Sequence, residues 1–465
     1  MKIKELFYRI KTPVRASIFY LGASVIGKAI GLITTPFFTR ALSVEEYGKF
    51  SLYMSLLGGV SVILSAFNSG SSVFIGLSHY KNDKIGYLKS VMMVSSAFSA
   101  LVCLLLLIFS SFLGIDARII GFLTLQVLCD GILAATLSLS KYEYSYTKVF
   151  IISVISAALP PLMAAFLLKQ FGGGYLVRIF TLLAVSLCLA VYSIIVLSKK
   201  NERPEVSKVR SVIKNSLPLL PHTVSSAMAV QADKIILSSV MGEDALAKYA
   251  VVYSLGAGLG FTVGAIGSAL GPWIIRRLEG GESEKISELV FPMVLGYFAL
   301  SAAVVAFAPE TIKILAPISY LDALPALLPL TLCTPFSFLS TVATVGLIHG
   351  GKGRESVLAS CVGAVLCLAL NFMLIPRFGY FGAGLSMLVS KMVEAVIAIY
   401  FLSKNGVKGI LSPKLVFPIL VSVGAGLCFY LLREQPTQRF LLLFFPFSIL
   451  VYSMWKGKSL LLEKG

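Results

Sequence analysis

Six ionisable residues lie inside long apolar stretches of this sequence, where a charge needs a partner or water. They are Lys28, Asp130, Asp233, Lys234, Lys391 and Glu394. Placing each one at bilayer depth costs about 2.5–3.5 kcal/mol or more. Three cations and three anions would together suit a hydrated cavity that accepts a substrate with both anionic and sugar groups.

The same residues also have a purely structural interpretation. Lys391 and Glu394 are one helical turn apart, and Asp233 is adjacent to Lys234, so each pair could neutralise itself and hold helices together. Both interpretations stay open for these pairs. In the sequence, neither Lys28 nor Asp130 has an opposite charge one helical turn away, which favours a functional role, although a direct bridge between them is the main alternative.

Carboxylates at bilayer depth are also candidates for ion coupling, because such groups serve proton relays and ion pathways. Asp130, Asp233 and Glu394 are therefore the candidate sites for H⁺ or Na⁺. We expect no cofactor and no metal site. The seven cysteines form no CxxC pair and have no histidine at zinc spacing, so we expect them to be small buried residues.

No pattern of an enzyme accompanies these residues. The glycine-rich segment at 350–354 lacks the spacing of a phosphate-binding loop, and no loop carries a cluster of paired carboxylates. A membrane-bound glycosyltransferase, ligase or polymerase would need a larger polar loop than any present. We expect a transporter and not an enzyme.

The elements that position these residues are predicted to be membrane-spanning helices. Of the 465 residues 57% are hydrophobic and 13% are charged, and the mean hydropathy is +0.89. This composition excludes a soluble enzyme and an outer-membrane barrel. Stretches of about 20 apolar residues predict fourteen spans, at 16–39, 50–76, 90–113, 118–140, 149–168, 175–197, 216–240, 246–274, 289–308, 326–348, 356–375, 380–402, 414–432 and 440–455.

The basic residues indicate how these spans are oriented. Most of the 40 Lys and Arg residues fall in the two tails and the even-numbered connections. The positive-inside rule then places both termini in the cytoplasm of a multi-pass protein of the inner, or cytoplasmic, membrane. The net charge of +18 is thereby explained by topology, and we expect no nucleic-acid partner.

An internal repeat predicts the domain organisation. The stretch at 45–60 resembles the stretch at 244–259, and a basic, polar segment separates the two halves. We expect an N-lobe over 1–197 (spans 1–6), a cytoplasmic linker over 198–214 and a C-lobe over 215–402 (spans 7–12). Spans 13 and 14 and the tail would occupy 403–465. Because six spans separate the two copies, they cross the membrane in the same direction. This predicts two lobes related by an axis along the membrane normal.

Three motifs carry a family resemblance: RALSVEEYG at 40–48, NSLPLLPH at 215–222 leading to ADKIIL at 232–237, and NFMLIPRFGYFGAG at 371–384. With the span count, they resemble Wzx-type polysaccharide (O-antigen, lipid-linked oligosaccharide) flippases of the multidrug/oligosaccharidyl-lipid/polysaccharide exporter superfamily. The resemblance implies an all-α fold with two six-helix lobes in a V around a central cavity. It also implies alternating access that carries undecaprenyl-pyrophosphate-linked oligosaccharide across the bacterial membrane.

The resemblance further implies cationic residues that hold the pyrophosphate. Lys28 matches a basic site in the first helix of lipid II flippases, where arginine is usual, and Arg40 matches the basic residue that ends the first span. Asp233 and Lys234 match a position where relatives often carry Asp-Arg. Lys28, Arg40, Lys234 and Lys391 are thus the candidate substrate-binding residues.

Besides the substrate and H⁺ or Na⁺, the expected partners are membrane lipids and polysaccharide polymerase or ligase machinery. Three alternative functions stay open. The first is a cation-coupled multidrug antiporter of the same superfamily, although such proteins usually have twelve spans. The second is a lipid II flippase, which usually has a more arginine-rich cavity, and the third is a non-transporting membrane partner of a polysaccharide synthase.

Overall fold

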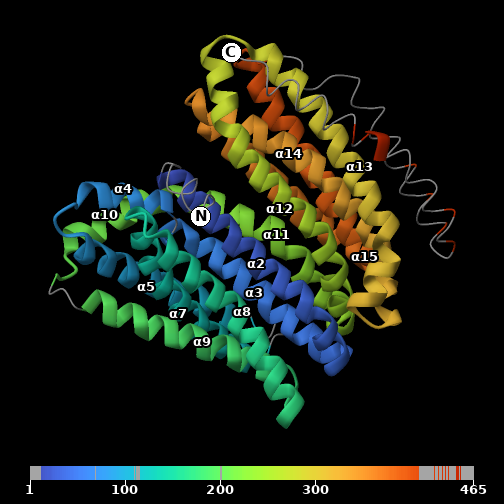
Figure 1. Ribbon diagram of the computed structural model, residues 1–465, viewed down its shortest axis with the longest axis horizontal. Coiled ribbons are helices and arrows are strands. Elements are labelled where there is room, and N and C mark those ends of the chain that lie inside the picture. Colours follow the sequence, from blue (N-terminus) through green and yellow to red (C-terminus); the bar gives the residue numbers. More distant parts are fainter. Residues whose placement is uncertain are drawn as a thin grey trace, which may run out of the picture. The chain divides into compact units, whose positions relative to one another are not determined.

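The computed structural model describes residues 12–68, 70–108, 110, 116–198 and 202–407, with isolated positions between 424 and 451. Helices make up this part of the chain, and it contains no strand (Figure 1). The all-α prediction is confirmed. The expected spans at 414–432 and 440–455 lie almost wholly outside the described residues.

The chain divides into two compact units, Met1–Ala227 and Met228–Gly465. In the N-terminal unit, α2 packs along α8, and α7 packs against both α5 and α9. The helices of this unit are α2 (Thr12–Ala41), α3 (Val44–Asn68), α4 (Gly70–His79), α5 (Lys84–Ile108), α7 (Ala117–Tyr142), α8 (Tyr146–Phe171), α9 (Gly174–Ser198), α10 (Val206–Ser216) and the short η1 (Leu217–Leu219).

The C-terminal unit has its core around α14, which packs against α12, α13 and α15. Large apolar side chains such as Phe338 and Leu339 are buried there. The helices that follow η1 are α11 (Leu220–Met241), α12 (Glu243–Glu279), α13 (Ser283–Leu315), η2 (Ile318–Ala326), α14 (Leu327–His349) and α15 (Gly353–Lys404). The boundary between the units falls inside α11.

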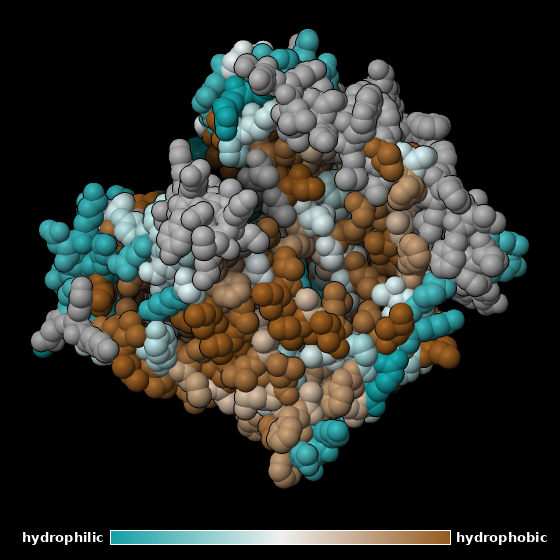
Figure 2. Space-filling view, viewed as in Figure 1, coloured by the Kyte–Doolittle hydropathy of each residue, from teal (hydrophilic) through white to brown (hydrophobic). Residues whose placement is uncertain are grey.

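Ten helices in the described part are long and apolar enough to cross a membrane. Where the structure describes them, the expected spans 1–12 coincide with helices, and two features explain why ten and not twelve helices are of this kind. Helix α11, which carries Asp233 and Lys234, does not reach the required hydropathy, and α15 is one element of 52 residues that contains the expected spans 11 and 12. Figure 2 shows the surface of the N-terminal unit. Apolar side chains cover much of its helical face, and hydrophilic side chains gather at the end where α4 and α10 lie.

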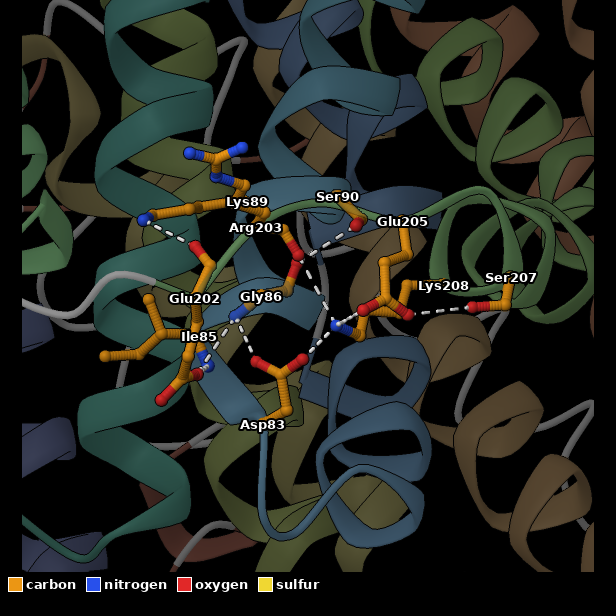
Figure 3. Close-up of polar contacts among 10 residues, drawn as sticks. All are labelled: Asp83, Ile85, Gly86, Lys89, Ser90, Glu202, Arg203, Glu205, Ser207 and Lys208. Atoms are coloured by element: carbon orange, nitrogen blue, oxygen red, sulfur yellow. Dashed lines mark hydrogen bonds and ion pairs between the residues drawn. The ribbon is translucent and has the colours of Figure 1, made fainter.

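The expected linker is largely a helix that docks on the N-terminal unit (Figure 3). The Lys208 ammonium on α10 donates to the carboxylate of Asp83, which precedes α5. Glu202 accepts hydrogen bonds from the backbone N–H groups of Ile85 (2.9 Å) and Gly86 (3.2 Å), so it caps the first turn of α5. Burial raises the pKa of Asp83, but hydrogen bonds from Lys208 and Gly86 outweigh it and leave that pKa below its ordinary value.

The cysteine prediction is wrong in part. Cys103, Cys129, Cys333 and Cys367 are buried, whereas Cys188 and Cys428 are exposed and Cys361 is half-buried. The reason is that an apolar stretch in a membrane helix has a lipid-facing side as well as a packed side. An apolar environment in sequence therefore does not imply burial within the protein.

Gly379 divides α15 at the junction of the two expected spans. Its φ of 55° and ψ of −129° lie in a region that is open almost only to glycine. The backbone bends there, so a single helical run becomes two arms. A side chain at this position would strain the bend whatever the surrounding space.

We predict that Gly379→Ala destabilises the protein by about 1–3 kcal/mol, the usual cost of a non-glycine residue in such a conformation. Gly353→Ala is the matched control, because Gly353 lies in the same helix, faces open space and has no positive φ. Thermal unfolding of the purified proteins in detergent measures the difference in Tm. Equal Tm values for the two variants would contradict the prediction.

Candidate functional site

A polar strip runs along the first helix of the N-terminal unit. Ser24, Lys28, Gly31 and Thr35 follow one another at helical spacing on α2, and the first three are exposed. The hydroxyls of Ser24 and Thr35 donate to backbone carbonyls one turn earlier, at 3.1 Å and 2.8 Å. The strip lies beside the face of α2 that packs against α8. Lys28 is therefore presented on the surface of this unit and not in its packed core.

Arg40 ends the same helix and is also exposed. Its Nη1 donates to the carbonyl of Pro36 at 3.0 Å, so the side chain folds back along the last turn of α2. A cation in this position interacts favourably with the carbonyl end of the helix. Arg40 thus has a local structural role whether or not it contacts a substrate.

Asp130 in the N-terminal unit is half-buried, and its carboxylate contacts the buried side chains of Gln126 and Ser186. Gln126, one turn earlier on α7, donates to both carboxylate oxygens at 3.1 and 3.0 Å, and Ser186 on α9 donates to Oδ1 at 2.8 Å. These donors are neutral. The hydroxyl of Tyr53, which interacts electrostatically with Asp130, is fully buried without a hydrogen-bond partner among the described residues.

In the C-terminal unit, Asp233 and Lys234 are both buried, at 2% and 7% exposed. The Tyr249 hydroxyl donates to Asp233 Oδ2 at 2.6 Å, and Lys234 Nζ is 3.5 Å from Asp233 Oδ1. Lys234 also donates to the Val230 carbonyl at 2.6 Å and lies 3.6 Å from the ring centre of Tyr253. The ammonium group is therefore enclosed by a carboxylate, a carbonyl and an aromatic face.

Lys391 and Glu394 form another charged pair in this unit. Lys391 Nζ donates to Glu394 Oε2 at 2.6 Å across one turn of α15. Ser340 on α14 and Ser360 on α15 each donate to the other carboxylate oxygen at 3.2 Å. The carboxylate thus ties α14 to both arms of α15.

The two pairs belong to one polar cluster in the core of the C-terminal unit. The thiols of Cys333 and Cys367 both interact electrostatically with Asp233 and with Lys391. Asn371, which is fully buried, donates to the Cys367 sulfur at 3.6 Å, and its amide oxygen has no partner among the described residues. The cluster holds equal numbers of cations and anions.

The structure thus brings together Asp233 with Lys234 and Lys391 with Glu394, as the structural interpretation expected. It places Lys28 and Arg40 on exposed positions of α2. The sequence analysis missed the neutral partners Gln126, Ser186 and Tyr249. Gln126 could have been found, because it precedes Asp130 by four residues on the same helix, whereas no local signal pairs Ser186 or Tyr249 with their carboxylates.

Arg178 on α9 was also missed. Its guanidinium group lies between the rings of Phe38 and Phe50, 3.8 and 3.6 Å from their centres, and it lies 5.7 Å from the ring centre of Tyr47. Such cation–π contacts are worth most where water is excluded. Arg178 therefore joins α9 to α2, which carries Phe38, and to α3, which carries Phe50.

Comparison with curated proteins found relatives of low identity. The chain is 26% identical over 262 residues to the "Uncharacterized membrane protein MJ1068" of Methanocaldococcus jannaschii, covering 54% of this chain and 52% of that protein. It therefore spans about half of that relative's length. It is 21% identical to the "Probable low-salt glycan biosynthesis flippase Agl15" of Haloferax volcanii, over 84% of this chain and 83% of the relative.

Comparison with solved structures shows the fold. The inward closed conformation of the lipid II flippase MurJ matches with a TM-score of 0.67 and 13% identity, over 94% of this chain and 98% of that one. An inward-facing multidrug resistance MATE family transporter of the MOP superfamily matches with a TM-score of 0.66 and 12% identity, over 81% and 94%. The polytopic transporter fold expected from the superfamily resemblance is confirmed.

The family itself is identified over more than half of the sequence. A family profile described as "Polysaccharide biosynthesis protein" matches residues 14–278, a range that contains the polar strip of α2, the Asp130 group and the buried pair on α11. Together with the fold and the apolar helices, this match shows that the chain is a multi-pass membrane protein that belongs to the polysaccharide biosynthesis protein family.

Proposed function

We propose that this protein is a flippase that moves a polyprenyl-pyrophosphate-linked oligosaccharide across the membrane by alternating access. The observation that carries the proposal is the exposed polar strip of α2, with Lys28 at its centre. An exposed cation in mid-span is costly against lipid, so this strip must border water or an anionic group. The undecaprenyl carrier, the cytoplasmic membrane of a bacterium and the cytoplasmic termini stay predictions.

Family and fold support the proposal from a second side. The chain belongs to a polysaccharide biosynthesis family, the relative from Haloferax volcanii bears the name of a glycan biosynthesis flippase, and MurJ shares the fold. The MATE transporter shares it nearly as well. The fold therefore supports transport in general, and the family match favours a glycan substrate over a drug.

The physical task fits this arrangement. A pyrophosphate and several sugars cannot enter hydrocarbon, because even one unpaired ion there costs many kcal/mol. The polyprenyl tail can stay in lipid while the headgroup follows a polar path along α2. Lys28 supplies a point charge for a phosphate, and the exposed Gly31 beside it leaves room for bulky groups.

The three candidate carboxylates differ in their suitability for ion coupling. Glu394 and Asp233 each face a lysine ammonium within 3.5 Å, so a change of charge on either would leave a buried cation uncompensated. Asp130 accepts hydrogen bonds from neutral donors. It can take up or release a proton without breaking an ion pair, and we propose it as the coupling residue.

The two pairs of the C-terminal unit then have a structural role. Lys391 and Glu394 join the arms of α15 to α14. The ammonium group of Lys234 is buried against protein groups, so a substrate would not reach it. Of the four cations expected to bind substrate, we therefore retain Lys28, with Arg40 near the end of the same helix. Lys234 and Lys391 neutralise the carboxylates that lie beside them.

We predict that Lys28→Ala, restored on a plasmid in a host that lacks the gene, lowers surface polysaccharide by about tenfold or more, since a hydrogen bond to a charged group is worth about 1.5–3 kcal/mol. Lipid-linked repeat units should accumulate facing the cytoplasm. Lys28→Arg keeps the charge and should restore most of the polysaccharide.

Lys352→Ala is the matched control, because Lys352 is an exposed cation in the connection between α14 and α15. It should support normal polysaccharide at equal protein level. Normal polysaccharide with Lys28→Ala would contradict the pyrophosphate role. Normal polysaccharide in the deletion strain, with altered sensitivity to cationic drugs, would contradict the proposed function and favour the multidrug antiporter.

We predict that Asp130→Asn abolishes the acceleration of flipping by an imposed ion gradient, because an amide cannot exchange a proton. The assay uses proteoliposomes with a fluorescent polyprenyl-pyrophosphate oligosaccharide, with and without a pH gradient. Asp322→Asn is the control, since Asp322 is an exposed carboxylate. A gradient response that survives Asp130→Asn would show that the coupling residue is another one.

We predict that removing one charge of the Lys391–Glu394 pair destabilises the protein more than removing both charges. Glu394→Gln or Lys391→Met should each cost about 3–5 kcal/mol, whereas the double variant should lie close to wild type. Lys49→Met, which breaks an exposed pair with Glu45, should cost less than about 1 kcal/mol. Thermal unfolding measures all four proteins, and single variants as stable as the double would refute the structural role.

A further inference from the structure

Helix α10, at Val206–Ser216, and its C-cap residue Leu217, which keeps a helical backbone conformation, carry three distinct strips. At 100° per residue, the side chains at 208, 212 and 216 form one strip, those at 206, 213 and 217 form the next, and those at 210 and 214 form the third. The strips follow one another around the helix. They differ in both burial and chemistry.

The first strip is docked on the N-terminal unit. Lys208, Val212 and Ser216 are buried, at 3%, 1% and 1% exposed, and α10 packs against α4 and α5. Lys208 donates to Asp83 and lies 3.3 Å from Glu205 Oε1 (Figure 3). This face already has its partner, and it fixes the rotation of the helix about its own axis.

The second strip is apolar and exposed. Val206, Ile213 and Leu217 are 85%, 42% and 57% exposed, and they lie directly beside the docked face. Three large apolar side chains aligned on one helix face are unfavourable in water. They suit the boundary between headgroups and acyl chains, where an amphipathic helix inserts its apolar face.

The third strip is basic. Arg210 and Lys214 are both exposed and lie on the far side of the apolar strip from the docked face, one turn apart. Cations at this position beside an inserted apolar face reach the level of lipid phosphates. Arg210 and Lys214 therefore complement an anionic surface that the apolar strip contacts at the same time.

The location of α10 agrees with this chemistry. It follows the membrane-spanning helix α9, which ends at Ser198, and it lies at the end of the N-terminal unit where the apolar surface gives way to hydrophilic residues (Figures 1 and 2). An apolar strip at this level meets the membrane boundary, whereas the same strip farther out would meet only water.

We propose that α10 binds anionic phospholipids of the leaflet that it faces, with Val206, Ile213 and Leu217 inserted among the acyl chains and Arg210 and Lys214 on the headgroup phosphates. The lipid surface and the Asp83–Lys208 contact then hold the helix from two sides. This inference does not depend on the transported substrate, because it rests on the linker helix alone.

The test is hydrogen exchange of the backbone amides over 206–217, measured by mass spectrometry on the full chain in nanodiscs. One set contains phosphatidylcholine alone, and the other contains phosphatidylcholine with phosphatidylglycerol. We expect exchange to be roughly tenfold slower with the anionic lipid, since each basic residue near an anionic surface contributes favourably, and we expect high salt to remove the difference.

Arg210→Gln with Lys214→Gln should abolish the effect of phosphatidylglycerol. Lys352→Gln with Arg354→Gln is the matched control. These exposed cations lie immediately before α15 and in its first turn, and they should leave the effect unchanged. Ile213→Asn should speed exchange in both lipids. Equal exchange of the wild type in the two lipids, or an effect that persists without Arg210 and Lys214, would overturn the proposal.

Discussion

An ionisable group surrounded by hydrocarbon needs a counter-charge, a set of hydrogen bonds or a path to water, and this requirement governs the arrangement of the chain. The carboxylates of the candidate site satisfy this requirement with counter-charges and hydrogen bonds. Glu394 has a lysine and two serines, and Asp233 has a lysine and a tyrosine. The helices that supply these partners are thereby fixed relative to one another within their unit. An apolar side chain can pack against lipid as well as against another helix. Polar contacts therefore specify which helices pack together.

The two units satisfy the requirement differently. In the C-terminal unit the charges of Asp233 and Lys234 cancel, as do those of Lys391 and Glu394, which favours a fixed core. In the N-terminal unit Asp130 has neutral donors, and the nearby Tyr53 hydroxyl is left without a partner among the described residues. A group of that kind responds to its surroundings more readily than a neutralised pair. The division places the responsive carboxylate in the same unit as the exposed lysine of α2.

Much of the fold could be predicted from the sequence, because membrane helices are long and their composition is distinctive. The i, i+3 spacing of Lys391 and Glu394 was sufficient to predict their contact. Contacts between helices were not predictable in this way, since Ser186 lies 56 residues from Asp130 and no periodicity relates them. Hydropathy also could not distinguish a lipid-facing surface from a packed one, which is why Cys188 was misjudged. The linker helix was missed because its charged and polar residues resemble a loop until the buried Lys208 is seen.

The position of the boundary between the units divides the polar residues of α11 between them. It falls at Ala227 and Met228, inside α11, which is helical from Leu220 to Met241. The described part of the expected linker belongs to the N-terminal unit, because Glu202, before α10, and Lys208, on α10, contact residues at the start of α5. Helix α11 therefore contributes to both units. His222 and Ser226 at its start fall in the N-terminal unit, and the buried carboxylate of Asp233 falls in the C-terminal unit.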